Sequence, residues 1–319
     1  MGPWSLTAFV LAFGGGVFGA AVGGLWAFCI CATMVILGSV VVLAGGSDFL
    51  LLQVGIGPIF GPHVGGFTCG IAASTYAAAI RKNHPTGAAK DILSPLLDTS
   101  WDVMLVGGLF GVFGHVVLQL LALVPIPWDA LALTVVLGCA VPRLIFQREM
   151  PWGNLVSIRE HGLLGTNDYA LSWVGWMSPP GRLLFTGLGA GLLSGALAMG
   201  LDEALAPMAA AGEISAGAAG VAPLLMGWAV SGFCLIALQL GTGPIQKVPA
   251  PHVISLLAAL TYLQTGSIIA AGIGGIFTAF LQELMARLVY NHGSNHIDPP
   301  ATAAVVGTLI LNLVLPLFT

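Results

Sequence analysis

The chain has very little charge. Of its 319 residues only 7% are charged, with nine Lys and Arg against thirteen Asp and Glu, whereas 57% are hydrophobic. Soluble globular domains carry about 25% charged residues, so this composition excludes that class and is typical of a polytopic membrane protein. The basic residues form no tract, which excludes nucleic acid as a partner. We expect the lipid bilayer to surround most of the chain.

Motifs for catalysis and for cofactors are also lacking. The sequence contains no Gly-x-Ser-x-Gly, no His-Glu-x-x-His and no phosphate-binding Gly-rich loop. The cysteines lie in apolar runs without the spacing of a metal site: Cys29, Cys31, Cys69, Cys139 and Cys234. His292 and His296 have a possible metal spacing in a polar loop, but further close ligands are lacking, and we interpret this loop as solvated. We expect no enzyme activity, no cofactor and no metal.

Long apolar runs are what the chain does have. A helix that spans a bilayer needs about 17 to 25 mostly apolar residues. On this criterion we predict an all-α integral membrane protein with about ten transmembrane helices. Their predicted ranges are 5–23, 25–45, 63–80, 102–123, 129–145, 182–201, 217–240, 252–264, 266–289 and 301–318.

The basic residues predict the orientation of these helices. With ten spans, every Lys and Arg falls in or beside a loop that follows an odd-numbered span, namely Arg81, Lys82, Lys90, Arg143, Arg148, Arg159, Arg182, Lys247 and Arg287. Because cytoplasmic loops carry the excess of Lys and Arg, this side is predicted to be cytoplasmic and both termini to lie outside. The composition and topology favour the inner (plasma) membrane of a prokaryote.

Two internal repeats divide the chain. The sequence motif at residues 53–63 recurs in a longer form at 239–252, and Gly107–Phe113 matches Gly274–Phe280. We predict a first five-helix repeat at 1–146, a cytoplasmic linker at 147–181 and a second five-helix repeat at 182–319. Because five is an odd number, the second repeat enters the membrane from the other side, so the two repeats have inverted topology.

Each copy of the repeated motif interrupts an apolar region with Gly and Pro. Helices are predicted to begin directly after these breaks, at His63 and at His252. The helix at 252–264 covers roughly 18–20 Å at ~1.5 Å per residue, too little for a ~30 Å hydrocarbon core, so it is expected to begin inside the membrane. Two helix N-termini then face each other near the midplane, each broken or re-entrant segment offering free N–H groups that suit an anion.

The predicted substrate-binding site follows from these breaks. Its members are Gln53, Gly57, Pro58, His63, Gln239, Gly243, Pro244, Gln246, Lys247 and His252. The two histidines either carry protons or cap helices, and Lys247 either compensates a bound anion or snorkels to the interface. Candidates for coupling or gating are Asp98, Asp102 and His115, with helix capping or a buried hydrogen bond as their structural alternatives.

These patterns predict a permease for a small polar solute, preferably a small anion or carboxylate, coupled to an ion gradient. A passive channel for a neutral or weakly basic solute is one alternative, and a non-transporting structural membrane subunit is another. The Gly-rich helix faces, such as 14–19 and 272–275, pack helices either within one chain or between the copies of a homo-oligomer.

Overall fold

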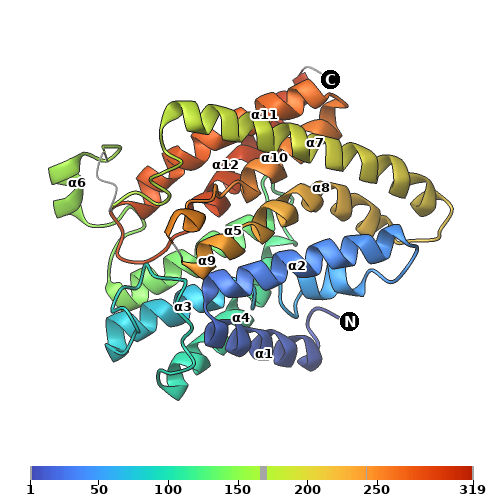
Figure 1. Cartoon of the computed structure of the whole chain (residues 1–319). Coiled ribbons are helices and arrows are strands. Elements are labelled where there is room, and N and C mark those ends of the chain that lie inside the picture. The colour runs from blue at the N-terminus through green and yellow to red at the C-terminus, as the bar shows by residue number, and fades with distance from the viewer. Residues whose placement is uncertain (1, 166–170, 242, 318–319) are drawn as a thin grey trace.

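The molecule is built of helices that lie roughly side by side. The computed structural model describes residues 2–165, 171–241 and 243–317, and within these ranges it contains no β-strand. Figure 1 shows α2 and α8 next to each other in the middle of the bundle, with α1 and α4 on one flank and α7 and α11 on the other. The predicted all-α class is therefore confirmed.

The helices of the first half alternate with short irregular segments. They are α1 Leu6–Val22, α2 Gly24–Leu43, the π-helix η1 Leu50–Gly55, α3 Thr68–Tyr76, its π-helical continuation η2 Ala77–Arg81, α4 Trp101–Leu121, α5 Ala130–Pro142 and its continuation η3 Arg143–Gln147. The short helix α6 Leu155–His161 follows. Side chains begin several of these helices by accepting a backbone N–H, as Ser5 does from Ala8 and Asn154 from Val156.

The second half has a similar order of elements. They are α7 Pro180–Ala210, α8 Ala216–Phe233, α9 Ile236–Leu240, η4 Gly243–Gln246, α10 His252–Thr265, α11 Ile268–Met285, η5 Ala286–Tyr290, α12 Pro299–Val314 and η6 Leu315–Leu317. Ser215 and Ser267 cap α8 and α11. Helix α7 continues to Ala210, beyond the predicted end at 201, and four of the nine added residues are Ala, which favours helix.

Within the ranges that the structure describes, seven helices are long and apolar enough to cross a membrane. They are Gly24–Leu43, Trp101–Leu121, Ala130–Gln147, Pro180–Ala210, Ala216–Leu240, Ile268–Tyr290 and Pro299–Leu317. The predicted spans at 5–23, 63–80 and 252–264 correspond to shorter helices, of which α1 has 17 residues and α10 has 14. The predicted number of ten spans is therefore not confirmed, and the short helix α10 agrees with the expectation that the helix after the second break is too short to cross a bilayer. The seven long apolar helices fit a membrane protein.

One prediction of a helix start was wrong. Helix α3 begins at Thr68 and not at His63, which lies in a series of turns. Gly61 and Pro62 before this residue and the Gly65-Gly66 pair after it all disfavour helix, so the break extends further than the first proline indicates. The corresponding start in the second half is as predicted, because α10 begins at His252.

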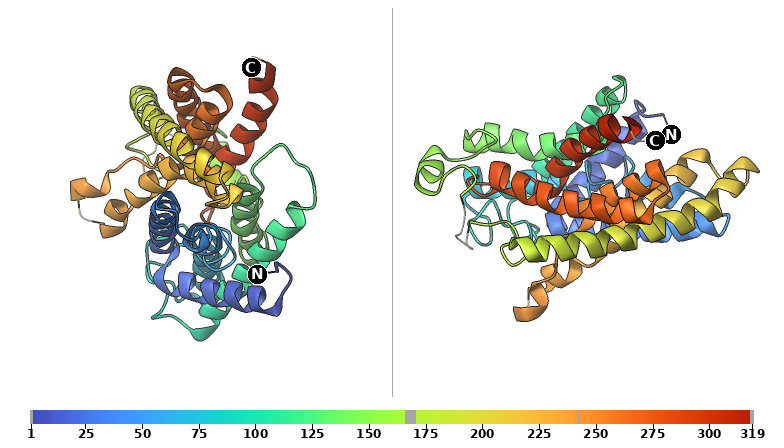
Figure 2. Two further views of the ribbon diagram at one scale, coloured as in Figure 1. Left: turned by 90° about the vertical axis from the view of Figure 1, so that its right-hand side faces the viewer. Right: turned by 90° about the horizontal axis from the view of Figure 1, so that it is seen from above.

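The connecting segments gather at two opposite ends of the bundle. At one end Asp48 accepts a hydrogen bond from Ser215 at 2.6 Å, and Asn312 donates to the carbonyl of Pro127 at 2.7 Å. The start of α1 and the end of α12 lie at this end, as both views in Figure 2 show. We call it the terminal end.

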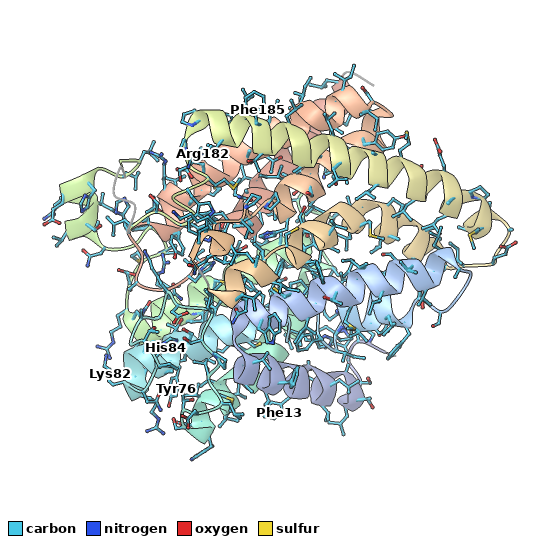
Figure 3. The ribbon with its side chains drawn as sticks, viewed as in Figure 1. Phe13, Tyr76, Lys82, His84, Arg182 and Phe185 are labelled. Atoms are coloured by element: carbon cyan, nitrogen blue, oxygen red, sulfur yellow. The ribbon has the colours of Figure 1, made fainter. Side chains whose placement is uncertain are left out.

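At the other end, the segments that carry the basic residues contact one another. The Lys90 ammonium donates to the carbonyl of Asn291 at 3.0 Å, and Arg287 donates to the carbonyl of Leu164 at 2.6 Å. Figure 3 shows Lys82 and Arg182 at this end and Phe185 on the side of α7. We call it the basic end. Large apolar side chains such as Phe185, 71% exposed, cover the flanks between the two ends, where lipid would contact them.

Glycine allows pairs of helices to approach closely within each half. A Cβ atom at Gly16 of α1 would lie 2.4 Å from the carbonyl oxygen of Gly107 in α4. Similarly, a Cβ atom at Gly275 of α11 would lie 2.3 Å from the carbonyl oxygen of Gly187 in α7. These glycines therefore pack helices of the same chain, which is the first of the two alternatives considered for them.

Candidate functional site

Two cavities lie in series within the bundle. The first cavity has a volume of about 170 Å³ and lies towards the basic end, and we call it the basic-end cavity. Its walls are Leu25, Phe28, Phe67, Lys90, Ile92, Leu93, Trp173, Val174, Trp176, Leu235, Leu238, Gln246, Ala250, His252, Tyr290, His296 and Asp298. The second, the terminal-end cavity, has about 200 Å³, is mostly apolar, and includes Ile56, Pro62, Asp129, Leu131, Val221, Trp228 and Ala301 in its walls.

The two cavities share a wall of four residues, which we call the neck: Phe28, Phe67, His252 and Asp298. Each of these is at most 6% exposed. The ring of Phe28 lies at the centre, with centroid distances of 5.5 Å to Phe67 and 4.9 Å to His252. It also contacts Trp228 edge-on at 5.2 Å. These packed rings separate the two cavities.

The starts of three helices position the neck. Phe67 directly precedes α3, His252 is the first residue of α10, and Asp298 caps α12 by accepting the N–H of Ala301 at 2.8 Å. Proline residues after Asp298 occupy the first helical positions, where a missing N–H costs nothing. Because the first N–H groups of a helix lack partners within it, these starts bring partial positive charge to the neck.

His296 extends the polar part of the neck towards the basic end. Its Nε2 lies 3.3 Å from Oδ1 of Asp298, and the edges of its ring meet Phe67 and Tyr290 at centroid distances of 5.9 and 5.0 Å. Among the residues that the structure describes, Nδ1 of His252 and Nδ1 of His296 have no hydrogen-bond partner. The neck and the adjoining His296 thus bring together one carboxylate and two imidazoles, each imidazole with an unpaired ring nitrogen.

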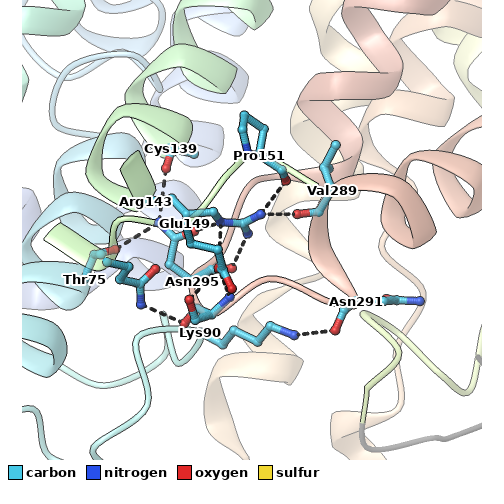
Figure 4. Close-up of polar contacts among 11 residues, drawn as sticks. Thr75, Lys90, Cys139, Arg143, Glu149, Pro151, Val289, Asn291 and Asn295 are labelled. Carbon is cyan, nitrogen blue, oxygen red and sulfur yellow. Dashed lines mark hydrogen bonds and ion pairs between the residues drawn. The ribbon is translucent and has the colours of Figure 1, made fainter. Parts of the chain in front are cut away.

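A buried arginine holds the segment that carries His296 and Asp298. Figure 4 shows the guanidinium of Arg143 among backbone and side-chain oxygens, where it donates to Oδ1 and O of Asn295 at 2.6 and 2.7 Å. It also donates to the carbonyls of Pro151 at 2.5 Å and Val289 at 2.8 Å. Gly293 is required beside it, because a Cβ there would lie 2.2 Å from the guanidinium. Arg143 therefore fixes the loop that enters α12.

Lys90 brings a positive charge to the basic-end cavity. Its ammonium lies 4.4 Å from the centre of the Tyr290 ring and donates to the carbonyl of Asn291. No Asp or Glu forms an ion pair with it within the described ranges. Burial lowers the pKa of Lys90 to about 8, because desolvation disfavours its charged form. At neutral pH this side chain is a cation that forms no ion pair with any carboxylate of the described residues.

The residues predicted from the second break are divided between the cavity and the surface. Gln246 and His252 line the basic-end cavity. Gln239 donates to the carbonyl of Leu93 at 2.8 Å, which is a structural contact. Gly243, Pro244 and Lys247 are exposed, so the position of Lys247 agrees with the interfacial alternative.

The first break contributes to the site through other residues than those predicted. Gln53, Gly57 and Pro58 belong to the segment at η1 and line neither cavity. His63 is 1% exposed, and its carbonyl oxygen packs against Gly114 of α4, outside both cavities. His63 and His252 therefore do not share a site in this structure. The residues of this break that line the terminal-end cavity are Ile56 and Pro62.

The predicted coupling residues lie away from the neck. Asp98 is exposed, and Asp102 pairs with Arg81 and accepts a hydrogen bond from Tyr76 at 2.9 Å. His115 lies in α4, where its Nε2 is 2.7 Å from the carbonyl oxygen of Pro3. The contact of His115 is the buried hydrogen bond considered as its alternative. Asp102 does not cap α4, whose cap position is Ser100, but forms an ion pair with Arg81 instead.

Several residues of the site were missed from the sequence. The loop of His292 and His296 was interpreted as solvated, yet both side chains are only 4% exposed. One signal could have pointed to Asp298: it caps α12 as Asp129 caps α5, and the two helices hold the last position of their halves. Both aspartates line the terminal-end cavity.

The chain belongs to the family of unknown function DUF7973, which matches residues 1–151 and 209–317. The matched ranges include all the residues of the neck, as well as Lys90, Arg143 and His296. No curated protein and no solved structure matches the chain.

Proposed function

We propose that this protein is a membrane permease that moves a small polar solute, preferably a small carboxylate, by exposing a central site alternately to the two ends of the bundle. One observation carries the proposal: two cavities on opposite sides of a thin neck share Phe28, Phe67, His252 and Asp298 as their common wall. Carriers need a binding site near the midplane that two gates can reach in turn.

Corresponding helix contacts in the two halves support an inverted repeat of five plus five helices. Helix α1 packs on α4 as α7 packs on α11, α3 packs on α4 as α10 packs on α11, and α3 contacts α5 as α10 contacts α12. The separation of the connecting segments into a basic end and a terminal end agrees with ten passages of the chain. In this proposal, α3 and α10 are the half-length helices that begin at the neck.

The chemistry of the basic-end cavity supports an anion. Lys90 is a cation that no carboxylate of the described residues pairs with, and the N-terminus of α10 faces the same cavity. Trp173 and Trp176 offer apolar surface to the rest of the solute, and Gln246 offers an amide. A volume of about 170 Å³ suits a solute of a few heavy atoms. A short-chain carboxylate has this size, charge and partly apolar character.

The neck favours a carrier over the two alternatives. A passive channel needs a continuous path, whereas the rings of Phe28, Phe67 and His252 pack against one another between the cavities. A structural subunit without transport would fill its middle with side chains, whereas this bundle keeps two cavities there.

Uptake into proteoliposomes tests the proposal. We would reconstitute the purified protein and measure the entry of labelled lactate, pyruvate, succinate, urea and glycerol, with protein-free liposomes as the baseline. We expect saturable uptake of at least one carboxylate and a marked loss with Lys90→Gln, but not with Lys82→Gln, which removes an exposed cation at the same end. Entry at the protein-free rate for every solute would refute the proposal.

A further inference from the structure

We propose that the ion coupled to transport is a proton and that His252, Asp298 and His296 bind it at the neck. This inference rests on the proposed permease function and adds the coupling ion to it. Protons suit this position because imidazole is the side chain whose ordinary pKa lies nearest neutral pH, and a carboxylate oxygen beside it can take up the same proton.

His252 is placed to exchange a proton with either cavity. It lines both of them, is 6% exposed, and its Nδ1 has no partner among the described residues. A buried polar atom without a partner is costly, and a role in chemistry or a bound water is what explains such an atom in a folded protein. In an alternating carrier, whichever cavity is open gives water access to this nitrogen.

Asp298 and His296 supply the next step of the path. The carboxylate uses Oδ2 to cap α12, which leaves Oδ1 for His296 at 3.3 Å. Asp298 also lines both cavities together with His252, so the carboxylate and the two imidazoles gather at one place in the bundle. The transfer moves one proton between ring nitrogens and a carboxylate oxygen, and only N–H or O–H bonds form and break.

The other titratable groups around the neck are few. Lys90 and Tyr290 face it from the basic-end cavity, Asp129 faces it from the terminal-end cavity, and Cys139 of α5 lies next to Asp298. Lys90 is a positive charge that lines the basic-end cavity, and the buried Arg143 holds a second one at the loop before His296. A carboxylate bound beside Lys90 and a proton bound at His252 would then cross together, so the uptake of a monocarboxylate would carry no net charge.

Lactate uptake under an imposed pH gradient tests this inference. Proteoliposomes would contain a pH-sensitive dye, and labelled lactate and protons would be followed together after the outside is acidified. A gradient of one pH unit drives about tenfold accumulation for each proton carried. We expect this accumulation in the wild-type protein, with entry of protons in step with lactate, and no change when a membrane potential is imposed. Protein-free liposomes again give the baseline.

Variants separate the proton site from the fold. Asp298→Asn keeps a good helix cap and removes the titratable group, so we expect it to fold, to equilibrate lactate across the membrane, and to lose the tenfold accumulation. His252→Ala is expected to behave similarly. His161→Ala removes an exposed histidine of α6 and should accumulate lactate as the wild-type protein does. Size-exclusion profiles and melting temperatures check that each variant is folded.

Three results would overturn the inference in distinguishable ways. Wild-type uptake of lactate that ignores the pH gradient would leave the permease intact and refute proton coupling. Tenfold accumulation by Asp298→Asn would keep the coupling and remove Asp298 from the path. A wild-type rate equal to that of protein-free liposomes for every carboxylate would remove the proposed function itself.

Discussion

Replacing Arg143 by Ala is expected to destabilise the protein strongly. The guanidinium is 0% exposed and donates four hydrogen bonds, of 2.5–2.8 Å, to oxygens of Pro151, Val289 and Asn295. Its loss leaves these buried acceptors without a donor and opens a cavity. Breaking such a buried charged network costs roughly 3–5 kcal/mol. Each unsatisfied buried acceptor alone costs about 1–3 kcal/mol, so the four acceptors together would exceed the roughly 3–5 kcal/mol expected for the substitution. We therefore expect part of the network to relax and find other donors.

Unfolding of the purified protein in detergent measures this loss. Arg159→Ala is the matched control, because Arg159 is exposed on α6, and substitutions at such surface sites usually change the free energy of unfolding by less than about 0.5 kcal/mol. Arg143→Lys should also be destabilising, since an ammonium cannot reproduce the fork of donors. Equal melting temperatures for Arg143→Ala and Arg159→Ala would refute the role given to Arg143.

Three further predictions concern charge, packing and topology. Because the pKa of Lys90 is about 8, the folded protein loses this positive charge as pH rises through that value, and carboxylate uptake should fall there. The residual uptake by Lys90→Gln should not show this fall. A pH profile of Lys90→Gln with the same fall as the wild-type protein would contradict the prediction. Gly114→Ala should cost about 1–3 kcal/mol in thermal unfolding, because an added methyl group overlaps the facing backbone, whereas Gly189→Ala, with free space around it, should not destabilise. In a cysteine-free background, an impermeant maleimide should label Ser47→Cys in intact cells and Lys82→Cys only after the membrane is opened; the reverse pattern would invert the topology.

The sequence was most informative where the physics is local. Apolar length predicted the membrane helices, and Pro251 followed by an apolar run predicted the start of α10 at His252. The distribution of basic residues predicted that the segments carrying them lie together, and Lys90 and Arg287 do contact segments far along the chain at the basic end. The misplaced start of α3 came from counting Pro62 as the last helix breaker, although the glycines after it extend the break.

The site was harder to predict because its contacts are not local. Phe28 and Phe67 look like ordinary apolar residues of a membrane helix and a turn, and only the packing of α2 against α3 and α10 makes them the wall between two cavities. The loop with His296 looks polar enough to be solvated. It is buried because Arg143 bonds to Asn295, 152 residues away, which no local pattern encodes.

The position of Arg143 also constrains the order in which the protein can be assembled. This residue lies in the half of the chain that the ribosome delivers first, but three of its four hydrogen bonds go to Val289 and Asn295, which are synthesised near the end. Until then a guanidinium without most of its acceptors must remain at the surface of the first half, where it can still reach water. Insertion of the last two helices therefore completes the first half, so a nascent chain stopped before them would leave that half unfinished.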